Sequence, residues 1–260
     1  MEAFLEHFQS FLFVLARLLG LFLVAPFFSS ESMSFSLKMI FAFMVTLIMY
    51  PIVSSYMPQV PGHMINYGIL VLSEMLVGVI LGFIVSIVFA SFQMAGEFFN
   101  NQIGFGYTEI LDPITQNSLP AIGTIKNLMA TAIFLVIGAH RFLIETMAYS
   151  FEKVQLLKFT AQVNQGLLQI FQESIGAMFV VAFKIALPVM GILFLVSLAE
   201  GLMGKAAQQM NVMSLSFPLK VFIGTLTLIA TLTFISTQMV QGIQISLDKV
   251  TILVRNWPKI

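Results

Sequence analysis

Long apolar segments are the feature that most constrains this fold, because a run of about 20 apolar residues can cross a bilayer as a helix. We count six, at about 8–28, 39–56, 74–90, 126–139, 174–199 and 221–247. Charged residues make up 9% of the chain, against roughly 25% in a typical soluble protein, and the mean hydropathy is +0.97. We therefore expect an all-α integral membrane protein with about six long apolar helices.

Two of these segments do not match the thickness of a bilayer. Segment 126–139 is too short to span alone, unless it extends through residues 142–144. Segment 221–247 holds 27 uncharged residues; at roughly 1.5 Å per residue a helix of that length exceeds a hydrocarbon core of about 30 Å. We expect this helix to tilt or to lie partly outside the bilayer.

Composition excludes several classes of function. Twelve basic and twelve acidic residues cancel, so no charge pattern for nucleic acid appears. The absence of cysteine excludes disulfides and thiol chemistry. The three histidines are isolated, and no nucleotide-binding or nucleophile motif occurs. We expect no catalytic residue, no metal site and no cofactor. The acidic start of the chain is unlike a signal peptide, so we expect the first segment to be retained.

A stripe of small residues runs along the third segment at every fourth position: Gly78, Gly82, Ser86 and Ala90. On a helix these positions stay near one face. Small side chains let another helix backbone approach closely, which is a common basis for helix association in lipid. We therefore predict a helix-packing face here.

A polar, glycine-rich stretch follows the third segment, from about Gln93 to Pro120. Its glycines, prolines and amides predict irregular backbone. Between apolar segments, such backbone is stable only against protein or beside water. It is interpreted either as an inward loop at a pore or as an ordinary polar loop outside the membrane.

Charged residues in or beside apolar segments form a second set of candidates. They are Arg17, Glu74, Glu97, Lys184 and Glu200. A cation at the centre of a spanning helix costs roughly 2.5–3.5 kcal/mol on insertion scales, so each should have a partner. Structural ion pairs are the favoured interpretation for these residues, with a lumen or proton-linked site as the alternative. Glu74 and Glu97 also fit helix ends.

An amphipathic stretch separates the fourth and fifth segments. Its polar side chains recur every three or four residues: Gln155, Lys158, Gln162, Gln165, Gln169 and Gln172. Such a stripe suits a water-filled lumen, a partner subunit or a solvated connector. Glycines, amides and Pro218 after the fifth segment predict a turn, so segments five and six should form a helical hairpin.

The order of short motifs resembles that of the FliR family of flagellar and injectisome export-gate proteins over nearly the whole chain. The motifs are Arg17-Leu-Leu-Gly20, Ala25-Pro-Phe27, the helix from Glu74 to Phe83, 93–97, Gln102-Ile-Gly104, Asp112-Pro113, Phe134, Gly138-Ala-His140, Ser150-Phe151, Ala186-Leu-Pro188, 201–211 and 217–220. The chain departs from the family at Gln208, where proline is usual before Gln-Met-Asn, and the family often has arginine near Lys205.

The resemblance implies one copy of the chain in a helical assembly with FliP and FliQ, enclosing the channel for unfolded flagellar export substrates. FlhB and FlhA are further implied partners, along with membrane lipid. It implies a single membrane domain with a FliP-like part (1–173) and a FliQ-like helical hairpin and tail (174–260). The implied location is the bacterial inner membrane, in the flagellar basal body, raised toward the periplasm.

The family's inward loop acts as a channel plug. Transferred to this sequence it falls near 101–123, and the residues expected to form the plug are Gly104, Phe105, Gly106, Tyr107, Ile110, Leu111 and Pro113. Glycine gives such a loop more than one accessible shape, while its apolar side chains can fill a narrow lumen.

Other functions remain open at this point. An injectisome subunit fits the same resemblance. A small-solute secondary transporter suits broken apolar segments with lone charges, although no matching half-repeats occur. A membrane protease lacks a paired nucleophile and base. A purely structural anchor would tolerate changes in the loop.

Overall fold

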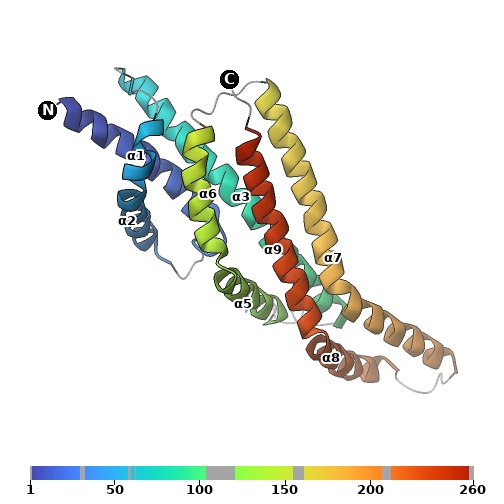
Figure 1. Ribbon diagram of the computed structural model, residues 1–260. Coiled ribbons are helices and arrows are strands. Elements are labelled where there is room, and N and C mark those ends of the chain that lie inside the picture. Colours follow the sequence, from blue (N-terminus) through green and yellow to red (C-terminus); the bar gives the residue numbers. More distant parts are fainter. Residues whose placement is uncertain are drawn as a thin grey trace. The chain divides into compact units, whose positions relative to one another are not determined.

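The computed structural model describes residues 2–29, 33–57, 60–61, 63–103, 121–154, 161–206 and 212–257. All regular elements in these ranges are helical (Figure 1). They are α1 (Glu2–Val24), α2 (Phe35–Val53), the short 3-10 helix η1 (Ser54–Tyr56), α3 (Met64–Ile103), α5 (Ala121–Val136), α6 (Ala139–Lys153), α7 (Ala161–Ala206), α8 (Val212–Ala230) and α9 (Leu232–Arg255). The prediction of an all-α fold is confirmed.

Four of the described helices are long and apolar enough to cross a membrane, and the number rises to six if each of two bent helix pairs counts as one span. The single helices are 5–24, 35–56, 64–103 and 165–206. The bent pairs join 125–136 to 139–153 and 215–230 to 232–255. The expected number of about six apolar helical segments agrees with this count.

The chain forms two compact units, one of 1–88, 134–176 and 243–260, the other of 89–133 and 177–242. The first unit has buried side chains such as Phe13, Leu18, Phe22, Leu81 and Leu143. The second has its own, including Phe92, Phe99, Ile103, Val189 and Leu193. The predicted division at residue 173 lies inside α7, and the likeness of either part to FliP or FliQ stays a prediction.

Helix α3 is longer than the sequence pattern predicts, since it continues to Ile103. The prediction of irregular backbone from Gln93 is therefore wrong over 93–103. Ala95 and Phe99 are fully buried four residues apart, and this apolar face favours helix over the turn preference of the neighbouring glycine and amides. Of the predicted plug loop, 101–123, residues 101–103 belong to α3 and 121–123 to α5, and residues 104–120 lie outside the described residues.

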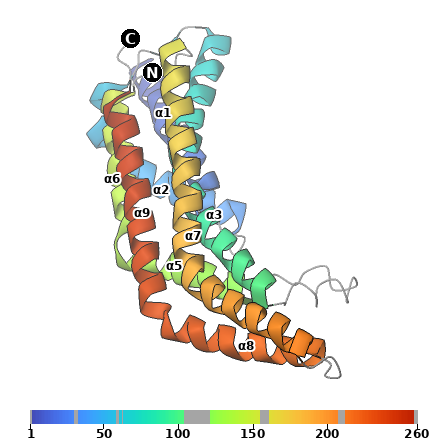
Figure 2. The same cartoon turned by 90° about the vertical axis from the view of Figure 1, so that its right-hand side faces the viewer.

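Helix α7 joins two stretches that the sequence pattern separates. It runs without a break through the polar stripe from residue 161, through Pro188 and on to Ala206 (Figure 2). The expected turn is thus helical over 200–206, and Pro218 likewise lies inside α8. Residues 207–211, where the remaining part of that turn was expected, are outside the described part.

Two helix breaks explain the segments of unsuitable length. Gly138 has a φ of +72°, a conformation open to glycine at little cost, and the chain bends by 62° between α5 and α6. The sixth segment is also bent by 62°, between α8 and α9 (Figure 2). There the Thr231 hydroxyl donates to the Thr227 carbonyl at 2.8 Å, a bond that favours helix bending.

Candidate functional site

A buried ion pair between Arg17 of α1 and Glu74 of α3 lies within the first unit. The two side chains are 1% and 2% exposed. Arg17 Nε donates to Glu74 Oε2 at 2.6 Å, and Arg17 Nη2 pairs with the same oxygen. Both residues were predicted to be buried and partnered, and the structure brings them together.

The remaining donors of Arg17 are used by α6 and the residue that follows it. Nη1 donates to Ser150 Oγ at 2.9 Å, and Nη2 donates to the Val154 carbonyl at 2.8 Å. Val154 caps the C-terminus of α6, so its carbonyl has no helical donor and lies at the negative end of the helix dipole. The guanidinium also lies 4.0 Å from the centre of the Phe151 ring.

One side chain therefore holds three helices in a fixed arrangement. Ser150 completes the network, because its hydroxyl both accepts from Arg17 and donates to the Met147 carbonyl at 2.6 Å. A network with its groups paired and shielded from water stabilises one packing of the helices. This geometry supports the structural interpretation of Arg17 and Glu74. We call Arg17, Glu74, Ser150 and Val154 the arginine clamp.

Next to the arginine clamp, the backbones of α1 and α3 approach each other closely. A Cβ added at Gly78 would overlap the Arg17 carbonyl oxygen, and one at Gly20 would overlap the Met75 carbonyl oxygen. At Gly82 it would lie 3.1 Å from the Leu21 oxygen. Gly20 was not predicted as a packing residue, although it is the counterpart of Gly78 on the facing helix.

The other half of the small-residue stripe, Ser86 and Ala90, contributes less to the close packing of α1 and α3. Ser86 is half-buried and donates to the carbonyl of Phe83 at 2.8 Å, within its own helix, and Ala90 is exposed. The close contact with the backbone of α1 thus lies at Gly78 and Gly82.

The three other predicted charges differ from one another. Glu200 pairs with Lys220 at 3.2 Å across α7 and α8, with side chains 12% and 22% exposed. Glu97 is half-buried on α3. Lys184 is exposed on α7, so the prediction that it is buried is wrong for the single chain. Its neighbour Ile185 faces the interior instead.

Sequence reasoning missed one buried cation. Lys126 of α5 is 3% exposed, and its Nζ lies 3.0 Å from the centre of the Phe99 ring. Within the described ranges this amino group has no hydrogen-bond partner. The available signal was a lone lysine at the start of an otherwise apolar segment, which the pattern analysis treated only as a segment boundary.

The predicted plug residues Gly104, Phe105, Gly106, Tyr107, Ile110, Leu111 and Pro113 all lie outside the described residues. Their role stays a prediction. In the described part of the chain no three His, Asp or Glu side chains are grouped so as to hold a metal ion.

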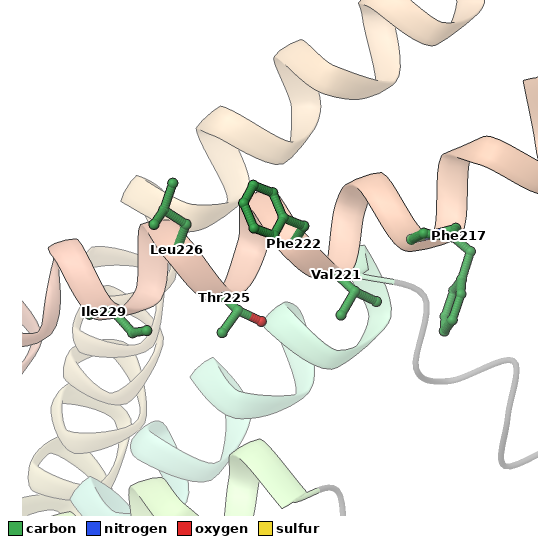
Figure 3. A pocket seen from close by; sticks show the side chains of 7 residues that line it. Phe217, Val221, Phe222, Thr225, Leu226 and Ile229 are labelled. Carbon is green, nitrogen blue, oxygen red and sulfur yellow. The ribbon is translucent and has the colours of Figure 1, made fainter.

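An apolar groove runs along α8 in the second unit. It has a volume of about 510 Å³ and is lined by Phe217, Pro218, Val221, Phe222, Thr225, Leu226 and Ile229. Figure 3 shows these side chains along one stretch of α8. Phe222 is 67% and Leu226 58% exposed, and a continuous apolar surface of this kind is typical of contact with lipid or another protein.

The fold and the site together define a class. The chain is an all-α integral membrane protein in which a buried ion pair joins helices α1 and α3, and many large apolar side chains are exposed on its surface. The sequence matches the family described as "Bacterial export proteins, family 1" over residues 8–245. The chain belongs to this family of bacterial export proteins.

Individual relatives agree with the family match. The flagellar biosynthetic protein FliR of Bacillus subtilis is 31% identical over 238 residues, covering 90% of each chain. FliR of Escherichia coli is 26% identical over 223 residues, 86% of this chain and 84% of its own. FliR of Borreliella burgdorferi is 26% identical over 236 residues, 90% and 87% respectively. The chain is thus a component of the flagellar protein export apparatus.

Proposed function

We propose that this chain is a core subunit of the flagellar export gate and forms, with FliP and FliQ, the channel that passes unfolded flagellar proteins across the inner membrane. Likeness to FliR over about nine tenths of the chain carries the proposal. Each of the three relatives named above is flagellar, which favours this assignment over an injectisome subunit. FlhB and FlhA are proposed as further partners.

The exposed apolar surface supports assembly with other subunits. On α7, the side chains of Leu187, Leu195 and Leu202 are 63–69% exposed, and Leu226 in the α8 groove is 58% exposed. The side chains of a neighbouring helix can pack between those along such an exposed apolar helix face. We therefore assign the α8 groove to a subunit contact within the gate.

Mass measurement of the complex that co-purifies with the full-length chain from its native membrane tests this assignment. We expect a complex containing FliP and FliQ. Leu226→Glu should reduce their recovery at least about tenfold, because a charge in an apolar interface is left unpaired, and Leu226→Met should not. A monomeric chain in the native membrane, or full recovery with Leu226→Glu, would contradict the proposal.

We further propose that the segment of 101–123 that joins α3 to α5 holds the plug of the channel. The support is the family membership together with the loop's composition, with Gly104 and Gly106 beside apolar Phe105. Deleting residues 105–111 should make cells leaky to small solutes, since an open pore of polypeptide width admits ions. Unchanged ion permeability in that deletion, with the complex assembled, would contradict the plug.

A further inference from the structure

A second cavity lies in the first unit, between the N-terminal part of α7 and the C-terminal part of α9, which run side by side in both views (Figures 1 and 2). Its volume is about 230 Å³, room for a group much larger than one water molecule. The lining mixes apolar and polar side chains: Gly166, Leu167, Gln169, Ile170, Glu173, Ile252, Leu253, Asn256 and Trp257.

The position of this cavity along the chain places it at the ends of two apolar helices. One candidate span begins at Gln165, and the bent pair that forms another ends at Arg255. Both walls of the cavity are therefore ends of apolar spans. A tryptophan beside a basic residue at such an end is typical of the level of the lipid headgroups, as for Trp257 beside Arg255.

An indole N–H without a partner and a solvent-exposed carboxylate lie at this cavity. Trp257 is 6% exposed, and in the described part of the chain its indole N–H has no hydrogen-bond acceptor. Glu173 is 57% exposed; its Oε1 accepts from Gln169 at 3.1 Å. Its Oε2 lies 3.9 Å from Lys249 Nζ, too far for a hydrogen bond. The site thus offers Glu173 Oε2 and the Trp257 indole N–H to a ligand, and the Lys249 ammonium lies next to Glu173, although Lys249 does not line the cavity.

We infer that this cavity binds a phospholipid with an ethanolamine headgroup. The primary ammonium donates to Glu173, the phosphate accepts from Lys249 and from the Trp257 indole after a small side-chain shift, and an acyl chain lies along exposed Ile252. A phosphatidylglycerol has neutral hydroxyl groups in place of the ammonium, so it offers Glu173 a hydrogen bond without an opposite charge. A choline headgroup has no N–H to donate. The inference requires only a membrane location and does not depend on the channel or its plug.

The only tryptophan of the chain, Trp257, provides the readout. Full-length protein in detergent micelles is titrated with phosphatidylethanolamine carrying brominated acyl chains, which quench nearby indole fluorescence. Phosphatidylglycerol and phosphatidylcholine with the same chains are run in parallel, as is free phosphoethanolamine in competition. We expect saturable quenching by phosphatidylethanolamine at least about tenfold tighter than by the other two lipids, a difference in line with one charged hydrogen bond.

Two substitutions test the assigned groups. Glu173→Gln should abolish the preference for phosphatidylethanolamine, while Glu145→Gln, at an exposed position of α6 away from the cavity, should keep it. Trp257→Phe removes the N–H but keeps an aromatic ring, and native mass spectrometry should show fewer retained phosphatidylethanolamine molecules. Equal quenching by all three lipids, or a preference unchanged by Glu173→Gln, would overturn the inference. Effective competition by free phosphoethanolamine would show that the headgroup alone is recognised and would overturn the lipid assignment.

Discussion

Removing Glu74 is the most direct test of the arginine clamp. Glu74→Ala leaves the guanidinium of Arg17 buried at 1% exposure, with Ser150 and Val154 still accepting but no counter-ion. Breaking a buried ion pair by deleting one partner costs about 3–5 kcal/mol of stability. This is a large part of the roughly 5–15 kcal/mol that holds a typical domain folded.

Replacing both partners should cost less than replacing one. In Arg17→Met with Glu74→Leu no charge is left buried, and such exchanges are often near neutral. Ser150 keeps its bond to Met147, but the Val154 carbonyl loses its donor, an unmet bond worth about 1–3 kcal/mol. We therefore expect the double variant to lose about 1–3 kcal/mol.

Denaturant unfolding of the full-length chain in mixed micelles, followed by circular dichroism, measures both losses. Glu145→Ala, at an exposed position of α6, is the control and should stay within about 0.5 kcal/mol of the wild type. If Glu74→Ala costs no more than the double substitution, the guanidinium is not a desolvated charge that needs its partner, and the reasoning fails.

Three further outcomes follow from the surroundings or the backbone conformation of individual glycines. Gly78→Ala should lower the recovery of folded protein severalfold, since the new methyl overlaps the Arg17 carbonyl, whereas Gly68→Ala on the same helix, with nothing near its Cβ, should be neutral or stabilise by up to about 1 kcal/mol; equal yields would count against close packing. Gly82→Leu should prevent assembly of the complex, because Leu21 lies too close for a large side chain, and normal recovery of the intact complex would argue otherwise. Gly138→Ala should destabilise the chain by about 1–2 kcal/mol in unfolding titrations, because a residue with a Cβ is strained at a φ of +72°; an unchanged midpoint would disprove the strain.

Periodicity and composition were sufficient for the helical membrane fold, because apolar length is a property of the sequence alone. They also indicated that Arg17 and Glu74 need partners, since charge in an apolar segment is costly wherever the segment packs. The identity of the partners was not predictable, because 57 residues separate the two along the chain and their meeting depends on how α1 crosses α3.

The wrong predictions arose where packing in the folded chain outweighs a local sequence signal. Local signals such as the glycine and amides of 93–103 predicted irregular backbone, but burial of Ala95 and Phe99 outweighs preferences of about 1 kcal/mol per residue. Lys184 and Lys126 show that the sequence pattern does not determine the burial of a charged side chain either. Both lie in apolar segments, yet one is exposed and the other is buried against Phe99, and only the helix rotation distinguishes them.

Close packing and the buried charge are two parts of one device at the α1–α3 crossing. Gly78 lies one helical turn after Glu74, and its missing Cβ is what lets α3 lie against the Arg17 carbonyl. A methyl at Gly78 must push the helices apart, and water then reaches the ion pair. Once water solvates Arg17, losing Glu74 costs less, because an exposed cation needs no partner.

The two substitutions should therefore be non-additive. We expect Gly78→Ala with Glu74→Ala to lose about 0.5–3 kcal/mol less stability than the sum of the single losses, the range of coupling for residues in contact. Gly68→Ala combined with Glu74→Ala is the control and should add within about 0.5 kcal/mol, since Gly68 has no neighbour at its Cβ. Simple additivity of the Gly78 pair in an unfolding titration would mean that the clamp stays dry without the glycine, and that the small-residue contact and the charge serve separate purposes.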